Sequence, residues 1–255
     1  MPRGTGQRTY RTEGIVLRGR DMGEADRLIT LLTPEHGTLR AVAKGARRMV
    51  SKKAGHLEPF CRCALLVAGG RELDLIAQVE TLDAFPGLRD DLDRLGPAWY
   101  ITELTERFSD EGTEQRVLYG HYLAALTALA HGADPDFVCR WYESTLLTLN
   151  GLAPSWSACA GCAAPVQPDT TYAFNLTRGG LLCPDCAATA LHDLVLDIDT
   201  VKLLRLLARE PLARLVHLRV PRPALANAAA TLTLALRAGL DSDLRTPGVL
   251  RQMGQ

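Results

Sequence analysis

Residues 159–186 have the sequence CAGCAAPVQPDTTYAFNLTRGGLLCPDC, and this stretch organises the second half of the chain. It contains two C-x-x-C pairs, Cys159 with Cys162 and Cys183 with Cys186, separated by twenty residues. Two residues between cysteines let one turn aim both sulfurs at a single point, and two such turns supply the four thiolates that tetrahedral Zn²⁺ takes in a closed structural site. The spacing therefore predicts one structural Zn²⁺ per chain, bound by these four cysteines.

Other interpretations of the cysteines stay open at this point. The two pairs could form two disulfides or remain two free vicinal thiol pairs. A thioredoxin-like redox role is disfavoured, because neither pair opens a helix after a buried strand in a βαβ pattern. His192 lies six residues beyond Cys186 and is a candidate substitute ligand, although four cysteines already complete a site.

The segment between the two pairs predicts two strands joined by a turn. Tyr172, Phe174 and Leu176 alternate with their neighbours, and the glycine-rich residues 178–180 follow as the turn. After the second pair we expect a helix over about residues 185–194.

The rest of the composition is that of a globular chain. Its 255 residues are 47% hydrophobic, enough for one large domain or two ordinary ones. We expect Cys61, Cys63 and Cys139 to be buried, small apolar residues in a reducing cytosol. Residues 1–9 lack the apolar core of a secretory signal, and residues 225–240 are too short and too polar to span a bilayer, so no membrane is expected.

Charge is segregated along the chain although the net charge is zero. Residues 1–53 hold 12 Lys and Arg against 5 Asp and Glu, a net of +7, and the remainder holds 17 against 24, a net of −7. A net charge of zero combined with a basic N-terminal segment indicates a polyanionic partner. The alternative is a basic surface that only solubilises the protein or docks on its acidic half.

The first half of the chain predicts a β-barrel. Short runs rich in branched apolar residues are separated by glycine-containing turns, with a longer insertion between the third and fourth. The number of strands and the positions of the turns between them predict a five-stranded Greek-key barrel of the OB type over residues 1–83. The expected strands are residues 14–18, 28–33, 38–44, 61–68 and 73–82.

One face of this sheet is expected to be apolar and the other basic. Alternation places Ile15 and Leu17 on the apolar face and Val16 on the opposite face, together with arginines. Aromatic residues are nearly absent from the first three strands, so we expect binding of nucleic-acid phosphates by charge rather than by base stacking. The predicted DNA-binding residues are Arg18, Arg20, Arg40, Lys44, Arg47, Arg48, Lys52 and Lys53.

The second half predicts helices around the cysteine stretch. We expect a helical domain over residues 84–156, a four-cysteine zinc-finger-like knuckle over 157–190 and further helices over 191–255, with a frayed C-terminus. Asp134 or Asp136 is a predicted helix cap, as is Asp199. The expected helices are residues 92–108, 113–130, 134–149, 201–208 and 223–238.

A basic stripe on one of these helices has two interpretations. Lys202, Arg205 and Arg209 stand three and four residues apart beside several leucines. They form either the solvated side of an ordinary amphipathic helix or a basic rim for an acidic peptide with an apolar end. The carboxylates of residues 90–93 invite a metal or acid–base interpretation, but acids near a helix N-terminus are usually a solvated face favoured by the helix dipole.

Enzyme signatures are missing from the sequence. It contains no phosphate-binding G-x-x-x-x-G-K-[ST] loop, no G-x-S-x-G elbow and no H-E-x-x-H motif. Four cysteines also leave no open position for a catalytic zinc. We therefore expect a nucleic-acid-binding protein and not an enzyme. The competing hypotheses are an RNA-binding or ribosome-associated OB protein with a structural zinc knuckle, and a metal-dependent nuclease that uses residues 90–93.

Several stretches in order resemble one known family. Residues 14–17 (GIVL), 23–27 (GEADR), 31–37 (LLTPEHG) and 43–48 (AKGARR), followed later by NGLAP at 150–154 and the two C-x-x-C pairs, resemble the RecO family. The resemblance extends from about residue 12 to about residue 240. Members of this family are bacterial recombination mediators and single-strand-annealing proteins.

The resemblance implies a set of partners and a location. It implies binding of single-stranded and double-stranded DNA, pairing with RecR, and loading of RecA onto DNA coated with single-strand binding protein. The acidic C-terminal tail of single-strand binding protein would dock on the helical half of the chain. The implied location is the cytoplasm, in association with the nucleoid.

Overall fold

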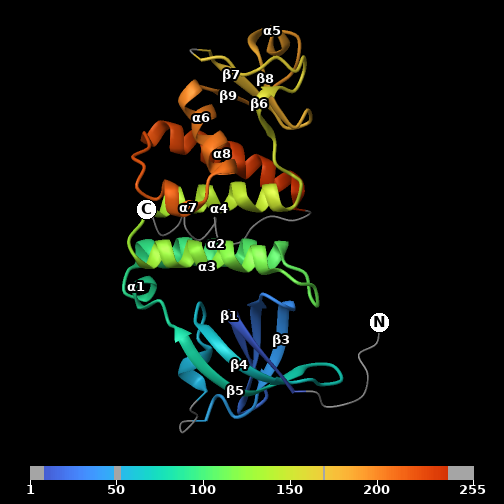
Figure 1. Ribbon diagram of the computed structural model, residues 1–255, viewed down its shortest axis with the longest axis vertical. Coiled ribbons are helices and arrows are strands. Elements are labelled where there is room, and N and C mark those ends of the chain that lie inside the picture. Colours follow the sequence, from blue (N-terminus) through green and yellow to red (C-terminus); the bar gives the residue numbers. More distant parts are fainter. Residues whose placement is uncertain (1–8, 49–52, 169, 241–255) are drawn as a thin grey trace. The chain divides into compact units, whose positions relative to one another are not determined.

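The computed structural model describes residues 9–48, 53–168 and 170–240 (Figure 1). The chain folds as two compact units, Met1–Ala130 and His131–Gln255. The first holds a closed barrel followed by helices, and the second holds further helices and a four-stranded sheet that carries the cysteine pairs. The predicted α+β fold class, with an OB-type barrel before a mainly helical region, is confirmed. The four-part domain division stays a prediction.

The barrel closes because its first strand pairs with two others. The strand order is β1-β2-β3-β5-β4, and β1 also pairs antiparallel with β4, so that the described barrel has no open edge. A short 3-10 helix, Ala54–Leu57, lies between the third and fourth strands. The strands are β1 (Thr9–Met22), β2 (Asp26–Thr33), β3 (Gly37–Ala43), β4 (Arg62–Ala68) and β5 (Asp74–Asp83).

A β-bulge in β1 corrects the predicted alternation. The register with β2 shifts between Val16 and Arg18, so Leu17 is the extra residue. Val16 packs in the barrel core with Ile29 and Leu31, not on the outer face. Ile15 and Leu17 are fully buried but do not belong to that core. One extra residue inverts the alternation on one side of the bulge, which a strict period of two cannot anticipate.

Two long helices complete the first unit. α1 (Pro86–Arg89) is followed by α2 (Leu92–Phe108) and α3 (Arg116–Ala130). A hydrogen bond of 2.7 Å joins the hydroxyls of Thr102 and Tyr122 between α2 and α3. The Asp91 carboxylate caps α2 by accepting from the backbone N–H of Asp93, which is the structural role expected of acids at a helix N-terminus.

These helices cover part of the outer face of the barrel. α2 contacts β1 and α3 contacts β2. Arg62 and Glu13 form an ion pair at 2.8 Å, next to the buried Tyr119 of α3. Burial is the main cause that raises the pKa of Tyr119, so the phenol stays neutral beside the pair. Such a polar contact favours one position of α3 on the barrel, whereas apolar packing alone would allow several positions.

The loop between α2 and α3 lies along the start of β3, and we call residues 109–115 the acidic strap. The backbone N–H of Thr38 donates to the carbonyl of Asp110 at 2.9 Å, and Glu111 forms isolated bridges with Gly37 and Thr38. The N–H of Gly112 donates to the His36 carbonyl, also at 2.9 Å. The strap is therefore held by backbone hydrogen bonds, independently of its side-chain charges.

Three long helices of the second unit pack against one another. The helices of this unit outside the cysteine stretch are α4 (Pro135–Leu149), α6 (Ile198–Arg209), α7 (Leu212–Leu215) and α8 (Arg222–Gly239). Trp141 and Tyr142 are buried, and the indole N–H of Trp141 donates to the Glu210 carbonyl at 3.0 Å. None of the described helices is both long and apolar enough to cross a membrane.

The helix caps of this unit confirm one prediction and correct another. The Asp134 carboxylate accepts from two backbone N–H groups at the start of α4, as predicted. The cap of α6 is Asp197, not Asp199, and it accepts from the N–H of Thr200 at 2.7 Å. Asp199 lies inside the first turn, because α6 begins three residues earlier than the apolar spacing indicated.

The four-stranded sheet has the order β6-β8-β7-β9. The predicted strand pair after Tyr172 is confirmed as β7 and β8, but the predicted helix over 185–194 is wrong. Only the single turn α5 (Pro184–Ala187) is helical, and the chain then forms β9, which pairs with β7. The pairing of β9 satisfies backbone groups of β7 that an extended helix would leave open. The strands are β6 (Ser155–Cys159), β7 (Tyr172–Asn175), β8 (Gly180–Leu182) and β9 (Leu194–Leu196).

Gly37→Ala should destabilise the first unit much more than Gly23→Ala. Both glycines have φ of +60°, which costs an alanine about 1 kcal/mol. An added Cβ at Gly37 would meet the Asp110 carbonyl oxygen of the acidic strap, whereas at Gly23 it meets nothing within 4 Å. We expect a further loss of roughly 1–3 kcal/mol for Gly37→Ala in urea unfolding. Equal losses for the two variants would contradict the packing of the strap on β3.

Candidate metal centre and nucleic-acid interface

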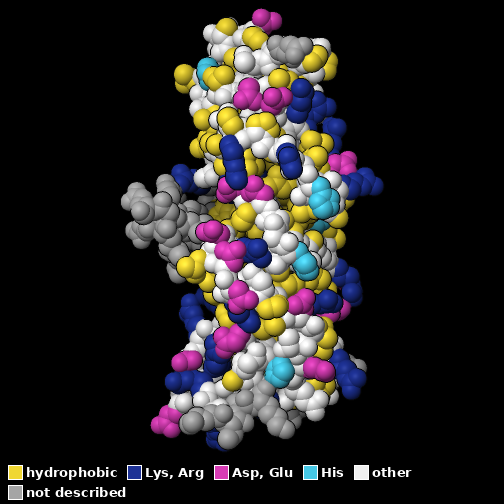
Figure 2. Space-filling model, turned by 90° about the vertical axis from the view of Figure 1, so that its left-hand side faces the viewer, with side chains coloured by type: hydrophobic (Ala, Val, Ile, Leu, Met, Phe, Trp, Pro, Cys, Tyr) yellow, Lys and Arg dark blue, Asp and Glu magenta, His cyan; other side chains and the backbone are white. Residues whose placement is uncertain are grey.

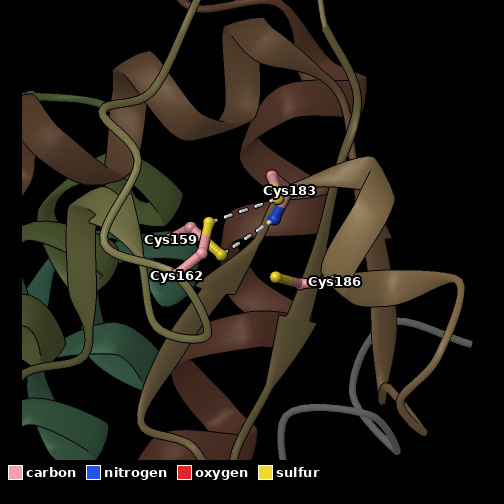
Figure 3. Close-up of side chains that lie close together, drawn as sticks. All are labelled: Cys159, Cys162, Cys183 and Cys186. Atoms are coloured by element: carbon pink, nitrogen blue, oxygen red, sulfur yellow. Dashed lines mark hydrogen bonds between the residues drawn. The ribbon is translucent and has the colours of Figure 1, made fainter.

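The four predicted cysteines converge on one point. Their Sγ atoms all lie within 4.8 Å of one another (Figure 3). Cys159 ends β6 and Cys162 lies in the turn that follows, whereas Cys183 caps α5 and Cys186 lies within it. The neighbouring strands β6 and β8 bring the two turns together, since Cys159 is paired with Leu181.

Backbone N–H groups favour the thiolate form at Cys159. The N–H groups of Gly161 and Cys183 each donate to Cys159 Sγ at 3.3 Å. Burial alone would raise the pKa of the Cys159 thiol, but backbone hydrogen bonds from Cys183, Cys162 and Gly161 together lower the pKa to about 6. A sulfur surrounded by N–H donors is prepared to act as an anionic ligand.

The geometry fits a tetrahedral metal ion. Metal–sulfur bonds of about 2.3 Å place the sulfurs of a regular tetrahedron about 3.8 Å apart. The Sγ atoms of Cys162 and Cys183 are 3.8 Å apart, and none of the four cysteines forms a disulfide. His192 is not a member of this group of potential ligands. The four cysteines can therefore hold one metal ion without a fifth residue.

Two further residues shape this centre. A Cβ built on Gly161 would lie 2.9 Å from Cys186 Sγ, so only glycine fits there without displacing the ligand. The same position is 3.2 Å from a guanidinium nitrogen of Arg178, which places that nitrogen no farther than about 6 Å from the sulfur, within effective Coulomb range. The glycine could have been noticed inside the C-x-x-C turn, whereas Arg178 could not, because its approach depends on the β7–β8 turn.

Several predicted DNA-binding residues already have partners inside the first unit. On β1, Arg18 forms an ion pair with Glu106 of α2 at 2.7 Å. Arg40 of β3 forms one with Glu111 of the acidic strap at 2.9 Å. Thr30 of β2 is the register partner of Arg18 on β1 and of Arg40 on β3. The two arginines therefore lie on the same outer face of these three strands, as predicted.

Two other members of the predicted set brace loops. Arg47 pairs with Asp21 at 3.2 Å and donates to the carbonyls of Gly23 and Glu24, which ties it to the β1–β2 turn. The ammonium of Lys53 donates to the Ile76 carbonyl at 2.8 Å. Lys52 lies outside the described residues.

The remaining members are Arg20, Lys44 and Arg48, and all three are exposed. None of them forms an ion pair with another described residue. Arg20 lies on the same outer face as Arg18, two residues farther along β1, and its register partner is Leu28 of β2. On the face of the barrel that Figure 2 shows, basic side chains alternate with acidic ones instead of forming one continuous patch. The available positive charge therefore belongs to fewer residues than the sequence indicated.

The basic stripe lies on α6 as expected. Lys202 pairs with Asp199 at 3.6 Å, Arg205 is half-buried and Arg209 is exposed. Leu206, on the same helix, is 41% exposed, so apolar surface adjoins the basic residues.

Known proteins resemble the chain over nearly its whole length. The family model described as Recombination protein O N terminal matches residues 7–85, and Recombination protein O C terminal matches residues 89–247. A protein of Roseiflexus sp. (strain RS-1) named DNA repair protein RecO is 41% identical over 248 residues, covering 97% of this chain and 87% of the relative.

Further relatives carry the same name. Those of Desulforamulus reducens and Desulforudis audaxviator are 36% and 38% identical, over 93% and 96% of this chain and 92% and 97% of their own lengths. The two family models meet between residues 85 and 89, where the barrel ends and the helices begin. The chain therefore belongs to the RecO family.

Proposed function

We propose that this chain is a DNA-binding recombination mediator without catalytic activity of its own. The observation that supports it most is the exposed set Arg20, Lys44 and Arg48 on a closed OB-type barrel. Such barrels bind oligonucleotides across the face that includes their second and third strands. Arg20 lies on β1 beside this face, and Lys44 and Arg48 lie in the turn that follows β3. These cationic side chains would contact phosphates and would neutralise repulsion between two strands, which is what annealing requires.

The proposed partners follow the family. Single-stranded and double-stranded DNA would bind through phosphate contacts, which carry no sequence information. With RecR, the chain would help load RecA onto DNA coated with single-strand binding protein, in the cytoplasm at the nucleoid. The acidic tail of single-strand binding protein would dock on Lys202, Arg205 and Arg209 of α6, where Leu206 offers adjoining apolar surface.

The proposed metal is one structural Zn²⁺ per chain. Four thiolates complete a tetrahedral shell and leave no position for water or substrate, so the ion would stabilise the fold and take part in no reaction. Its binding free energy would contribute to the stability of the second unit, in which both cysteine turns lie. Arg178 would offset part of the negative charge of a four-thiolate centre.

Replacing Arg20, Lys44 and Arg48 together with Gln should flatten the salt dependence of DNA binding. Each phosphate contact contributes a slope of about −0.7 in log K against log salt on single strands, so the triple change should make the slope shallower by about 2. Fluorescence anisotropy with one oligonucleotide at several salt concentrations measures this. The matched control is Arg205→Gln with Arg209→Gln. If only the control flattens the slope, the barrel is not the main DNA site.

Cys183→Ser should lower both the zinc content and the thermal midpoint of unfolding, because the ion stabilises only the folded state. Arg178→Gln should keep the ion and weaken its binding by about two- to five-fold, the effect of removing one exposed charge near the centre. Competition with a chromogenic chelator, together with metal analysis, measures both effects, with Arg237→Gln as the control. Purified protein without zinc and with four freely reactive thiols would refute the closed site.

Arg205→Glu should weaken binding of an acidic peptide that ends in apolar residues by about five-fold or more, since one favourable contact becomes a repulsive one. DNA binding by the barrel should be retained. Peptide anisotropy measures the effect, and Arg237→Glu is an exposed control on another helix. Unchanged peptide affinity after reversal of all three stripe residues would identify the stripe as a solvated helix face.

A further inference from the structure

The acidic strap lies beside the outer face of the barrel that the proposed function assigns to DNA. Backbone hydrogen bonds hold the strap along β3 regardless of side-chain charge, with Thr38 N–H donating to the Asp110 carbonyl at 2.9 Å and Gln115 N–H donating to the Pro34 carbonyl at 2.9 Å. This arrangement places the Glu111 carboxylate 2.9 Å from Arg40. A carboxylate is thus presented to the arginine in the position that a phosphate oxygen would occupy.

The two acidic partners of the barrel arginines differ in how easily a phosphate could replace them. In the Arg18–Glu106 pair, only 38% and 24% of the side-chain surface is exposed, and both residues lie within strand and helix. In the Arg40–Glu111 pair the exposed fractions are 53% and 58%. Exposed ion pairs are weak, because water screens them and both side chains lose freedom. Phosphate can therefore displace Glu111 from Arg40 much more readily than it can displace Glu106 from Arg18.

We propose that Glu111 is a built-in competitor of DNA phosphate for Arg40. This inference rests on the proposed DNA-binding role of the barrel. Glu106 keeps Arg18 in its ion pair when DNA binds, whereas Glu111 can release Arg40 to a phosphate. The strap then sets the affinity of the barrel for any strand below what its arginines would give, and it does so without reading sequence, because both competitors are simple anions.

The test uses Glu111→Gln and Glu114→Gln on the full chain. Both changes remove one negative charge from the strap, but Glu114 pairs with Arg116 at 2.9 Å and not with an arginine of the barrel. Anisotropy with one single-stranded oligonucleotide should show tighter binding for Glu111→Gln than for Glu114→Gln, by about two- to five-fold, which is the range that releasing one exposed pair allows. Thermal unfolding should be unchanged in both, because backbone bonds hold the strap.

Dependence on Arg40 distinguishes competition from a general charge effect. Arg40→Gln alone should change DNA affinity little, but added to Glu111→Gln it should remove the gain. Equal affinities of Glu111→Gln and Glu114→Gln, or a gain that persists without Arg40, would overturn the inference while leaving the proposed function intact. If the triple change at Arg20, Lys44 and Arg48 leaves affinity at the wild-type value, the barrel is not the DNA site, and both proposals fail.

Discussion

The first unit depends on one constraint: β1 must form hydrogen bonds with two strands at once. Its first half pairs with β4 and its second half with β2, and Ile15 takes part in both ladders. The strand has to bend where it changes partner, and the bulge at Leu17 provides that bend. Closure removes the open sheet edges and leaves the outer face as the surface on which helices, strap and charged residues are arranged.

The second unit is organised by the cysteine centre together with the helix core. Both cysteine turns belong to a sheet of short strands. Cys159, Ala173 and Leu182 form a small buried cluster beside the turns, and Trp156 and Phe174 of the same sheet are buried with their rings stacked. Hydrophobic burial therefore stabilises this sheet, and a metal ion held by the four cysteines would add its binding free energy to that of folding. Backbone atoms do much of the positioning, since Gly161 leaves room for a ligand sulfur and N–H groups point at Cys159.

Local patterns in the sequence were enough to predict the type and order of most elements, the five-stranded barrel and the four cysteines that converge on one point. These patterns are alternation, helical spacing, glycine-containing turns and C-x-x-C pairs. The basic character of the first 53 residues is also a property of the sequence alone. The helix after the second cysteine pair was predicted wrongly, because the pairing of β9 with β7 is a long-range event that outweighs local propensity.

Which basic residues remain available was settled by tertiary contacts. In the sequence Arg18, Arg20 and Arg40 cannot be told apart, because the alternation of each strand places all three on the outer face of the sheet. The packing of α2 on β1 brings Glu106 to Arg18, and the α2–α3 loop brings Glu111 to Arg40. Neither glutamate is near its partner along the chain. The free energy of a charge depends on its neighbours in space, and those neighbours are fixed by the fold and not by local sequence.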